Sequence, residues 1–338
     1  MKRFLKVTIM LCVGLVCASC VHEFPEAPCQ PEVRLNIEHE LSWSEYDFIY
    51  DNSDATRAAG NVAQARYIIR AYRSGDTPSV PYEFVRTTSD LSLKPFYTSL
   101  FLPEGEWDIY VWQDIVVENR PFYDVADFAR ITYTDPYEGA TDSREAFEGR
   151  CSITVRSGNN TDATVSLERP FAKYAFIATD LGKFYDEVLV PSSRDDSRIP
   201  VDKKMWTTLS LQEKKELLSG YTVTACYPLF MPSVYDLFDQ RPVSSDRGKK
   251  YTAQIEPLGD TEALIAFDYV FMNHRDNDVQ VQLVLHTPEG SDIVMSPIVE
   301  VPLRRNRITY VRGGFLTSGI SGGLDIDFEF GGDFNIEI

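Results

Sequence analysis

The sequence is poor in cysteine, which excludes folds and sites that depend on this residue. Only three of the six cysteines lie beyond Cys20, namely Cys29, Cys151 and Cys226. An odd trio without close pairing is not a disulfide framework, and none of its spacings is that of a zinc site. One disulfide among these three residues stays open, and our default expectation is that none forms.

Catalytic and metal-binding patterns are also missing. The four histidines, at 22, 39, 274 and 286, are scattered, and we expect His39 and His286 on strands and His274 in a loop. There is no nucleophile elbow, P-loop or dinucleotide-binding glycine pattern. The acidic runs at 195–196 and 276–278 lack the twelve-residue calcium loop, so we expect solvated loops there. The two carboxylates of a glycosidase are paired in space and not in sequence, so such a pair stays open among the 51 acidic residues, although their abundance singles none of them out. We therefore expect no catalytic residue, no metal and no cofactor.

Excess positive charge is absent. The chain has 33 basic and 51 acidic side chains, for a formal net charge of −18. Nucleic-acid binding requires a basic footprint against the phosphates, so this balance argues against a nucleic-acid partner. A net charge of this size is typical of a well-solvated surface protein.

What is present begins with a secretory signal over residues 1–19. Basic residues are followed by an apolar stretch over 7–16 and by small residues just before Cys20. The stretch is too short to span a bilayer, which takes about 20 apolar residues. The cysteine after Ala-Ser is typical of a bacterial lipobox, although Cys17 stands where leucine is usual. We expect acylation of Cys20, with an unmodified secreted protein as the alternative, and a proline-rich tether over 20–31.

Most of the remaining chain has the strand pattern, in which short runs of β-branched and aromatic residues end at Gly, Pro, Asn or Asp. The runs lie at 33–37, 67–72, 83–85, 100–102, 107–112, 151–155, 163–167, 173–179, 221–227, 263–272, 279–286, 308–312 and 325–330. Glycine-containing turns at 103–105 and 157–160 join the run 100–102 to 107–112 and the run 151–155 to 163–167, and both pairs are predicted hairpins. Short helices are predicted at 144–147, 180–188 and 209–218.

These patterns predict an all-β protein with a few short helices. Since a single core seldom grows past about 250–300 residues, two β-sandwich domains in series are expected. Pro170 follows shortly after a predicted strand and cannot continue its hydrogen bonding. We therefore place the domain boundary there, with domains at 32–169 and 170–338. The tryptophans at 43, 107, 112 and 206 are expected in the cores, because aromatic residues at alternate strand positions more often fill a sandwich core; exposed aromatic platforms for sugars are the alternative.

Five local strings resemble those of the Bacteroidota family of fimbrillin-like and fimbrial anchor or minor-subunit lipoproteins. They are Gly105–Trp112, Arg144–Gly149, Leu167–Lys173, Pro302–Arg307 and Gly314–Thr317. The resemblance covers both halves of the chain. It implies two transthyretin-like sandwich domains, a lipid anchor in the outer membrane, and other fimbrial subunits as partners.

In polymerising members of that family, an arginine-directed protease removes the first strand and opens a groove that a strand of another subunit fills. Arg57 lies in a stretch of small and polar residues that is typical of an exposed loop, so it is a candidate processing site, with an ordinary loop arginine as the alternative. The tail at 325–330 and 333–338 alternates acidic and apolar residues. It fits either a donor strand or, more simply, a final strand in its own sheet.

Three functions remain open. The first is a non-enzymatic outer-membrane lipoprotein that acts as a fimbrial anchor, structural or accessory subunit, assembles through strand exchange and supports adhesion at the cell surface. The second is a glycan-binding surface lipoprotein of a nutrient-uptake system. The third is a secreted hydrolase with an accessory sandwich domain.

Overall fold

The computed structural model describes residues 30–40, 63–75, 80–189 and 205–317, together with the backbone of 327–331. Nearly all regular structure there is strand, and the helices are short: α3 (Leu181–Phe184) and α4 (Leu211–Leu218), with single turns elsewhere. The prediction of an all-β chain with a few short helices is therefore confirmed. The signal peptide, Cys20, Cys29, Trp43, Arg57 and the residues at 195–196 and 333–338 lie outside the described residues.

The first sandwich consists of two facing sheets. One sheet has the order β10 (Thr161–Leu167), β1 (Glu32–His39), β4 (Phe96–Phe101). The other has the order β3 (Tyr82–Thr88), β2 (Ala63–Arg73), β5 (Gly105–Val117), β6 (Arg120–Pro121), and β9 (Ala146–Val155) also pairs with β5. Alternate residues of these strands point inward and form a core that includes Leu35, Ile69 and Val111.

The second sandwich is larger. One of its sheets has the order β16 (Glu256–Pro257), β17 (Ala263–Phe271), β11 (Phe171–Ala178), β21 (Ile308–Gly313), β22 (Asp327–Gly331). The other has the order β15 (Lys250–Gln254), β12 (Thr222–Cys226), β18 (Asn277–His286), β19 (Asp292–Met295), with β20 (Val299–Leu303) also on β18. Every residue of β11 and β17 is buried, because both faces of these strands are covered.

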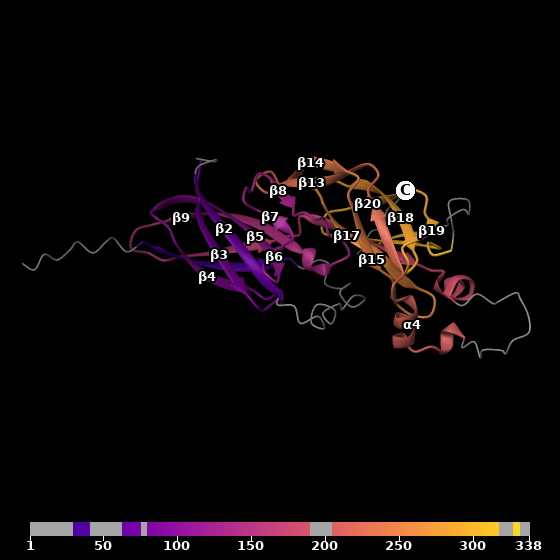
Figure 1. Ribbon diagram of the computed structural model, residues 1–338. Coiled ribbons are helices and arrows are strands. Elements are labelled where there is room, and N and C mark those ends of the chain that lie inside the picture. The colour runs from indigo at the N-terminus through magenta and orange to yellow at the C-terminus, as the bar shows by residue number, and fades with distance from the viewer. Residues whose placement is uncertain (1–29, 41–62, 76–79, 190–204, 318–326, 332–338) are drawn as a thin grey trace, which may run out of the picture.

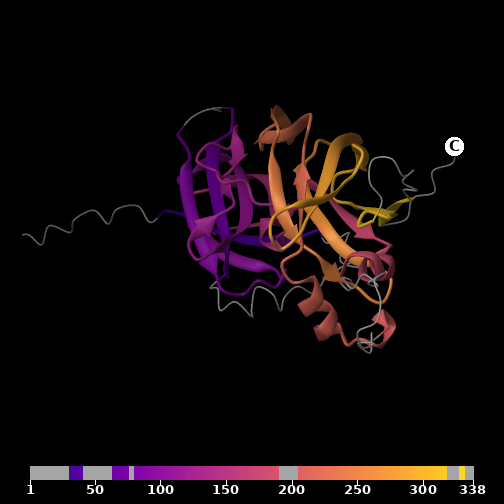
Figure 2. The same cartoon turned by 45° about the vertical axis from the view of Figure 1, so that its right-hand side comes forward.

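A small third sheet joins the two halves of the chain. Strands β7 (Tyr123–Asp124) and β8 (Ile131–Tyr133) continue onto β13 (Phe230–Asp236) and β14 (Arg241–Arg247). Figures 1 and 2 show the magenta segment that carries β7 and β8 between the indigo and orange lobes. Its aromatic side chains pack into the second core, where the Tyr133 ring stacks on Phe271 with centroids 4.7 Å apart. Packing therefore crosses the Arg169–Pro170 connection between β10 and β11, at which the domain boundary is predicted.

Each predicted strand overlaps an observed strand, but both turns that were predicted to close hairpins act differently. Strand β4 pairs with β1, whereas β5 pairs with β2, so the turn at 103–105 connects two sheets and its hairpin expectation is wrong. The turn at 157–160 was expected to close a hairpin, and that expectation is wrong. Strand β9 pairs with β5 and strand β10 pairs with β1, so the chain passes from one sheet of the sandwich to the other at this turn. Gly158 has a φ of 76°, which is compatible with a tight turn of either kind.

The tail and two of the three predicted helices agree with their predictions. The helix predicted at 144–147 is wrong, because a single 3₁₀ turn lies at Asp142–Arg144 and Ala146 and Phe147 already pair with β5 as the start of strand β9. Residues Asp327–Gly331 pair antiparallel with β21, which makes them a final strand in their own sheet. Helix α4 begins at a capping box, in which the Ser210 side chain accepts from the Glu213 N–H and the Glu213 carboxylate accepts from the Ser210 N–H. This capping box lies at the start of the helix that the sequence places at 209–218.

Strand β5 carries two tryptophans whose side chains lie in different cores. The Trp107 side chain lies in the first core, whereas Trp112 lies in the second core with its ring edge-on to Tyr123 at 5.4 Å. Truncating a buried aromatic side chain costs about 3–5 kcal/mol. We predict that Trp112→Ala lowers amide protection from hydrogen exchange mainly in β11 and β17, although its strand belongs to the first sandwich.

The matched control is Trp107→Ala, which should lower protection mainly in β1, β2 and β9. Equal loss across both sandwiches in both variants would show that the cores do not respond separately.

Candidate functional site

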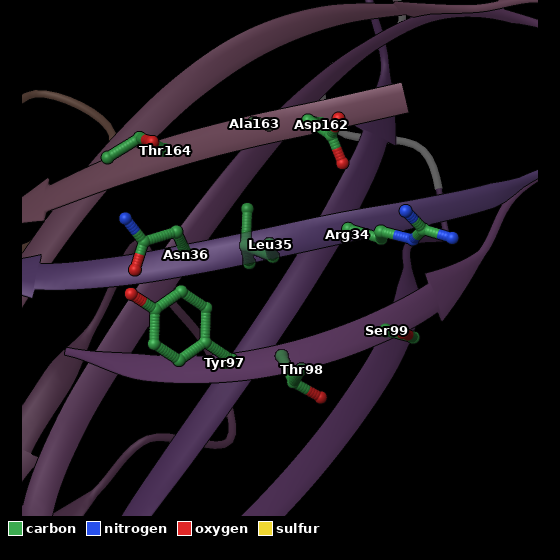
Figure 3. A pocket seen from close by; sticks show the side chains of 9 residues that line it. All are labelled: Arg34, Leu35, Asn36, Tyr97, Thr98, Ser99, Asp162, Ala163 and Thr164. Carbon is green, nitrogen blue, oxygen red and sulfur yellow. The ribbon is translucent and has the colours of Figure 1, made fainter. Parts of the chain in front are cut away.

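The candidate site is strand β1 together with the slot that it fills. Strand β1 is parallel to β10, with partners from Val33 to His39, and antiparallel to β4, with partners from Glu32 to Ile37. Figure 3 shows β1 in the middle of the three strands. Because β1 is hydrogen-bonded along both edges, a sheet without it would have two unpaired strand edges facing each other.

The inward face of β1 is an apolar row. Val33, Leu35 and Ile37 alternate along the strand and are 0%, 1% and 0% exposed. Burying an aliphatic side chain of this kind stabilises a fold by about 1.5–3 kcal/mol, so the row contributes roughly 5–9 kcal/mol as an upper estimate. The slot between β10 and β4 is therefore shaped for an extended segment with an apolar residue at every second position.

The outward face of the same sheet is polar and has two cross-strand rows. Tyr97, Asn36 and Thr164 are neighbours in one row, and Ser99, Arg34 and Asp162 in the next. Two members of the second row donate hydrogen bonds to the Glu32 carboxylate, Ser99 Oγ at 2.7 Å and Arg34 Nε at 3.2 Å. The Ser99 hydrogen bond is the largest of the effects that lower the pKa of Glu32.

His39 continues the inward row at the end of β1. Its ring lies edge-on to Phe147 at 4.8 Å, and both ring nitrogens are buried without a hydrogen-bond partner among the described residues. Burial disfavours the charged imidazolium, so the pKa of His39 is lowered from its usual value of about 6.5. His39 thus favours the neutral form while β1 is in its slot.

This lowered pKa predicts a pH dependence. Below about pH 6.5 the unfolded chain binds a proton at His39 that the folded chain resists, so the free energy of unfolding falls as the pH falls from there toward the folded-state pKa. We predict that His39→Gln reduces the loss of stability between pH 7.5 and pH 5.5, measured by urea unfolding. His274→Gln, in an exposed loop, is the control; an equal reduction in both variants would contradict the assignment to His39.

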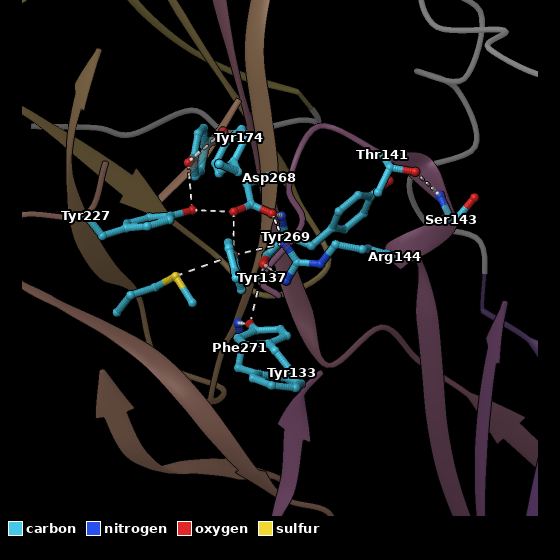
Figure 4. Close-up of polar contacts among 12 residues, drawn as sticks. Tyr133, Tyr137, Thr141, Ser143, Arg144, Tyr174, Tyr227, Asp268, Tyr269 and Phe271 are labelled. Carbon is cyan, nitrogen blue, oxygen red and sulfur yellow. Dashed lines mark hydrogen bonds and ion pairs between the residues drawn. The ribbon is translucent and has the colours of Figure 1, made fainter. Parts of the chain in front are cut away.

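The cluster that most resembles an active centre lies elsewhere and is closed. Arg144 and Asp268 form an ion pair at 1% and 0% side-chain exposure. Tyr137 and Tyr227 donate hydrogen bonds to the Asp268 carboxylate at 2.6 and 2.7 Å, and Tyr174 contacts Tyr227 at 2.7 Å (Figure 4). Burial raises the pKa of Asp268, and Arg144 opposes that shift. Tyr137 is partly exposed, but Arg144, Tyr174, Tyr227 and Asp268 are buried, so the geometry is that of a structural tie between the first half of the chain and β17.

The Arg144–Asp268 pair yields a stability prediction. Removing one partner of a buried ion pair leaves an uncompensated charge and costs about 3–5 kcal/mol. We predict this loss for Arg144→Met and for Asp268→Asn in urea unfolding. The double variant should lose clearly less than the sum of the two, since no unpaired charge remains. Additive losses would contradict direct coupling of the two residues.

The structure places the other candidate residues apart from one another. Cys151 and Cys226 lie on β9 and β12 as free thiols, and Trp107, Trp112 and Trp206 are all buried. Among the described residues, no three His, Cys, Asp or Glu side chains gather as a metal site. Within that same part of the chain, no helix is long and apolar enough to cross a membrane. His39 and His286 lie on strands and His274 in a loop, as predicted.

The polar rows of the outward face were not predicted. The run from Phe96 to Phe101 (FYTSLF) carries an alternation of inward and outward residues, but sequence reasoning recognised a strand only at its end. Tyr97 was therefore missed. The alternation in FYTSLF was the one local signal that could have placed it.

Comparison with known proteins establishes a family. Residues 28–338 match a family of unknown function (DUF6562), and the chain belongs to it. No protein of curated function is detectably similar in sequence.

Several solved structures are similar in outline. One is a candidate adhesin from Bacteroides thetaiotaomicron, with 7% identity, coverage of 90% of this chain and 97% of that chain, and a TM-score of 0.47. The fimbrial anchor protein Mfa2 from Porphyromonas gingivalis has 10% identity, covers 88% and 99%, and has a TM-score of 0.40. The tip fimbrial protein Mfa3 from Porphyromonas gingivalis, truncated at its C-terminus, has 13% identity, covers 89% and 99%, and has a TM-score of 0.41.

These neighbours are of the same kind as the family that the sequence strings resemble. Their TM-scores are below 0.5, and the functions of these proteins do not transfer to this chain on that basis.

Proposed function

We propose that this chain is a cell-surface subunit of a bacterial fimbrium, held in the outer membrane through acylated Cys20, which assembles by β-strand complementation and supports adhesion. The observation that carries the proposal is the position of β1. This first strand lies between two strands from distant parts of the chain and fills an apolar slot with Val33, Leu35 and Ile37. The lipobox and the five family-like strings support the same function.

Strand complementation follows from the chemistry of such a slot. An incoming extended segment gains main-chain hydrogen bonds along both edges, and alternating side chains that enter the core give specificity. Any segment with apolar residues at every second position meets the geometric requirement that β1 meets now. A neighbouring subunit is therefore a suitable source of a replacement strand.

Cleavage after Arg57 would divide the protein into two functional forms, an uncut and a cut chain. It lies between β1 and β2 in sequence, so cleavage there would separate β1 and Cys20 from the rest of the protein. An uncut chain keeps its own first strand and its lipid, and serves as an anchor. A cut chain has an open slot and serves as a structural or accessory subunit. N-terminal sequencing of protein extracted from intact cells distinguishes them, since Ala58 marks the cut chain and an acylated Cys20 marks the anchor.

The proposed role is structural and not enzymatic. The closed Arg144–Asp268 cluster offers no access for a substrate, and the buried tryptophans weaken the alternative of a sugar platform built on Trp107, Trp112 or Trp206. Assembly by insertion of a partner strand into the slot of β1 uses main-chain hydrogen bonds and apolar burial alone, so it requires neither a cofactor nor a metal.

Limited proteolysis tests the exchange of β1. The chain from residue 21 onward is nicked with an arginine-specific protease and then mixed with an excess of labelled peptide 32–40. We predict that the nicked protein exchanges its own strand for the peptide, because the slot reforms the same hydrogen bonds and burial. Size-exclusion chromatography with the label as readout measures the exchange.

Two controls define the result. The Arg57→Lys chain should stay uncut at that position and take up no peptide. A peptide with Leu35→Asp should fail to bind, because it brings a charge into the core, whereas one with Glu38→Ser should bind normally. Loss of β1 without uptake of any peptide would refute strand complementation.

A further inference from the structure

The outward face of the β10–β1–β4 sheet contains a shallow depression. It has a volume of about 630 Å³ and opens to solvent directly above the three strands (Figure 3). Pockets of about 300–1,000 Å³ are typical of small-molecule sites. The depression lies on the face opposite to the apolar row of β1, so the β1 side chains that face it are Arg34 and Asn36 and not those that enter the core.

One aromatic ring and a mixed set of polar groups line it. The Tyr97 side chain is 72% exposed, and in Figure 3 its ring lies flat along the sheet beside Asn36. The polar groups come from all three strands: Ser99, Arg34, Asp162, Asn36 and Thr164. The Arg34 guanidinium can only donate hydrogen bonds, and the Asp162 carboxylate can only accept them. The remaining amide and hydroxyl groups can do both.

One of these groups lacks a partner. Asn36 Nδ2 donates to Glu38 at 2.6 Å, but Asn36 Oδ1 is buried and has no hydrogen-bond donor among the described residues. A buried acceptor without a donor is unfavourable in the free protein. The unmet acceptor lies next to the exposed ring.

The charges around the depression and on the whole chain favour a neutral ligand. Arg34 is balanced locally by Asp162 on the neighbouring strand and by its ion pair with Glu32 at 3.2 Å. The chain as a whole carries a net charge of −18, which disfavours an anionic ligand. A lipid would need a continuous apolar surface, and the two cross-strand rows are polar apart from the Tyr97 ring. A neutral molecule with many hydroxyls and one apolar face matches the depression.

We propose that this face binds a short neutral oligosaccharide. The apolar face of one sugar ring stacks on Tyr97, and its hydroxyls exchange hydrogen bonds with Asn36, Thr164 and the Arg34–Asp162 row. Two of the contributing side chains, Arg34 and Asn36, belong to β1. The same strand therefore closes the first core on one face and completes the sugar site on the other.

The experiment measures binding of lactose, maltose, cellobiose and mannobiose to the folded chain from residue 21 onward, by calorimetry and saturation-transfer NMR. Sialyllactose is the anionic comparison. At least one neutral sugar should bind, and more tightly than sialyllactose. Tyr97→Ala should weaken that binding about tenfold or more, equivalent to about 1.4 kcal/mol, and Thr164→Val should weaken it about threefold.

The matched control is Phe101→Ala, which removes a 52% exposed aromatic ring from the same face of the same strand, outside the depression. It should leave the affinity unchanged within about twofold. The proposal is overturned if none of the four neutral sugars binds, if Tyr97→Ala binds as the parent does, or if Phe101→Ala loses as much affinity. Circular dichroism confirms that each variant is folded.

Discussion

The first sandwich depends on the backbone pairing of β1 along both of its edges. A strand at the edge of a sheet is held on one side only, whereas β1 joins β10 and β4, which do not pair with each other. Its main-chain hydrogen bonds and its apolar row act together, because the row enters the core only when the register with both neighbours is correct. A shift of one residue would turn Val33, Leu35 and Ile37 toward solvent. The slot therefore selects a pattern, and β1 is one sequence that satisfies it.

Polar groups as well as apolar packing connect the two halves of the chain. Arg144 pairs with Asp268, and Arg305 pairs with Glu148 at 2.6 Å while Tyr235 donates to the same carboxylate. Each pair joins a residue before Arg169 to one after it. Buried ion pairs add little net stability against apolar replacements, but they penalise any arrangement that leaves one partner unpaired. They therefore favour one relative placement of the two sandwiches.

Features that depend on a local residue pattern could be predicted from the sequence, whereas features that depend on pairing between distant strands could not. Strands with alternating apolar residues, such as 33–37, were recognisable because period-two burial is a local property. The strand Arg241–Arg247 was not, since its residues are mostly exposed and polar and its place in the sheet comes from pairing with β13. The turn at 157–160 was recognisable as a turn, but its glycine does not say whether the next strand stays in the sheet or crosses to the other one.

The sequence by itself determined the fold class, two of the three predicted short helices and the burial of the tryptophans on β5. Each of these depends on composition or on residues near one another in the chain. Only the tertiary structure decided that β1 lies between β10 and β4, that Tyr97, Asn36 and Thr164 form one row, and that Arg144 meets Asp268. These contacts join residues about 60 to nearly 130 positions apart, and their pairing is set by the packing of whole sheets, which no local pattern encodes.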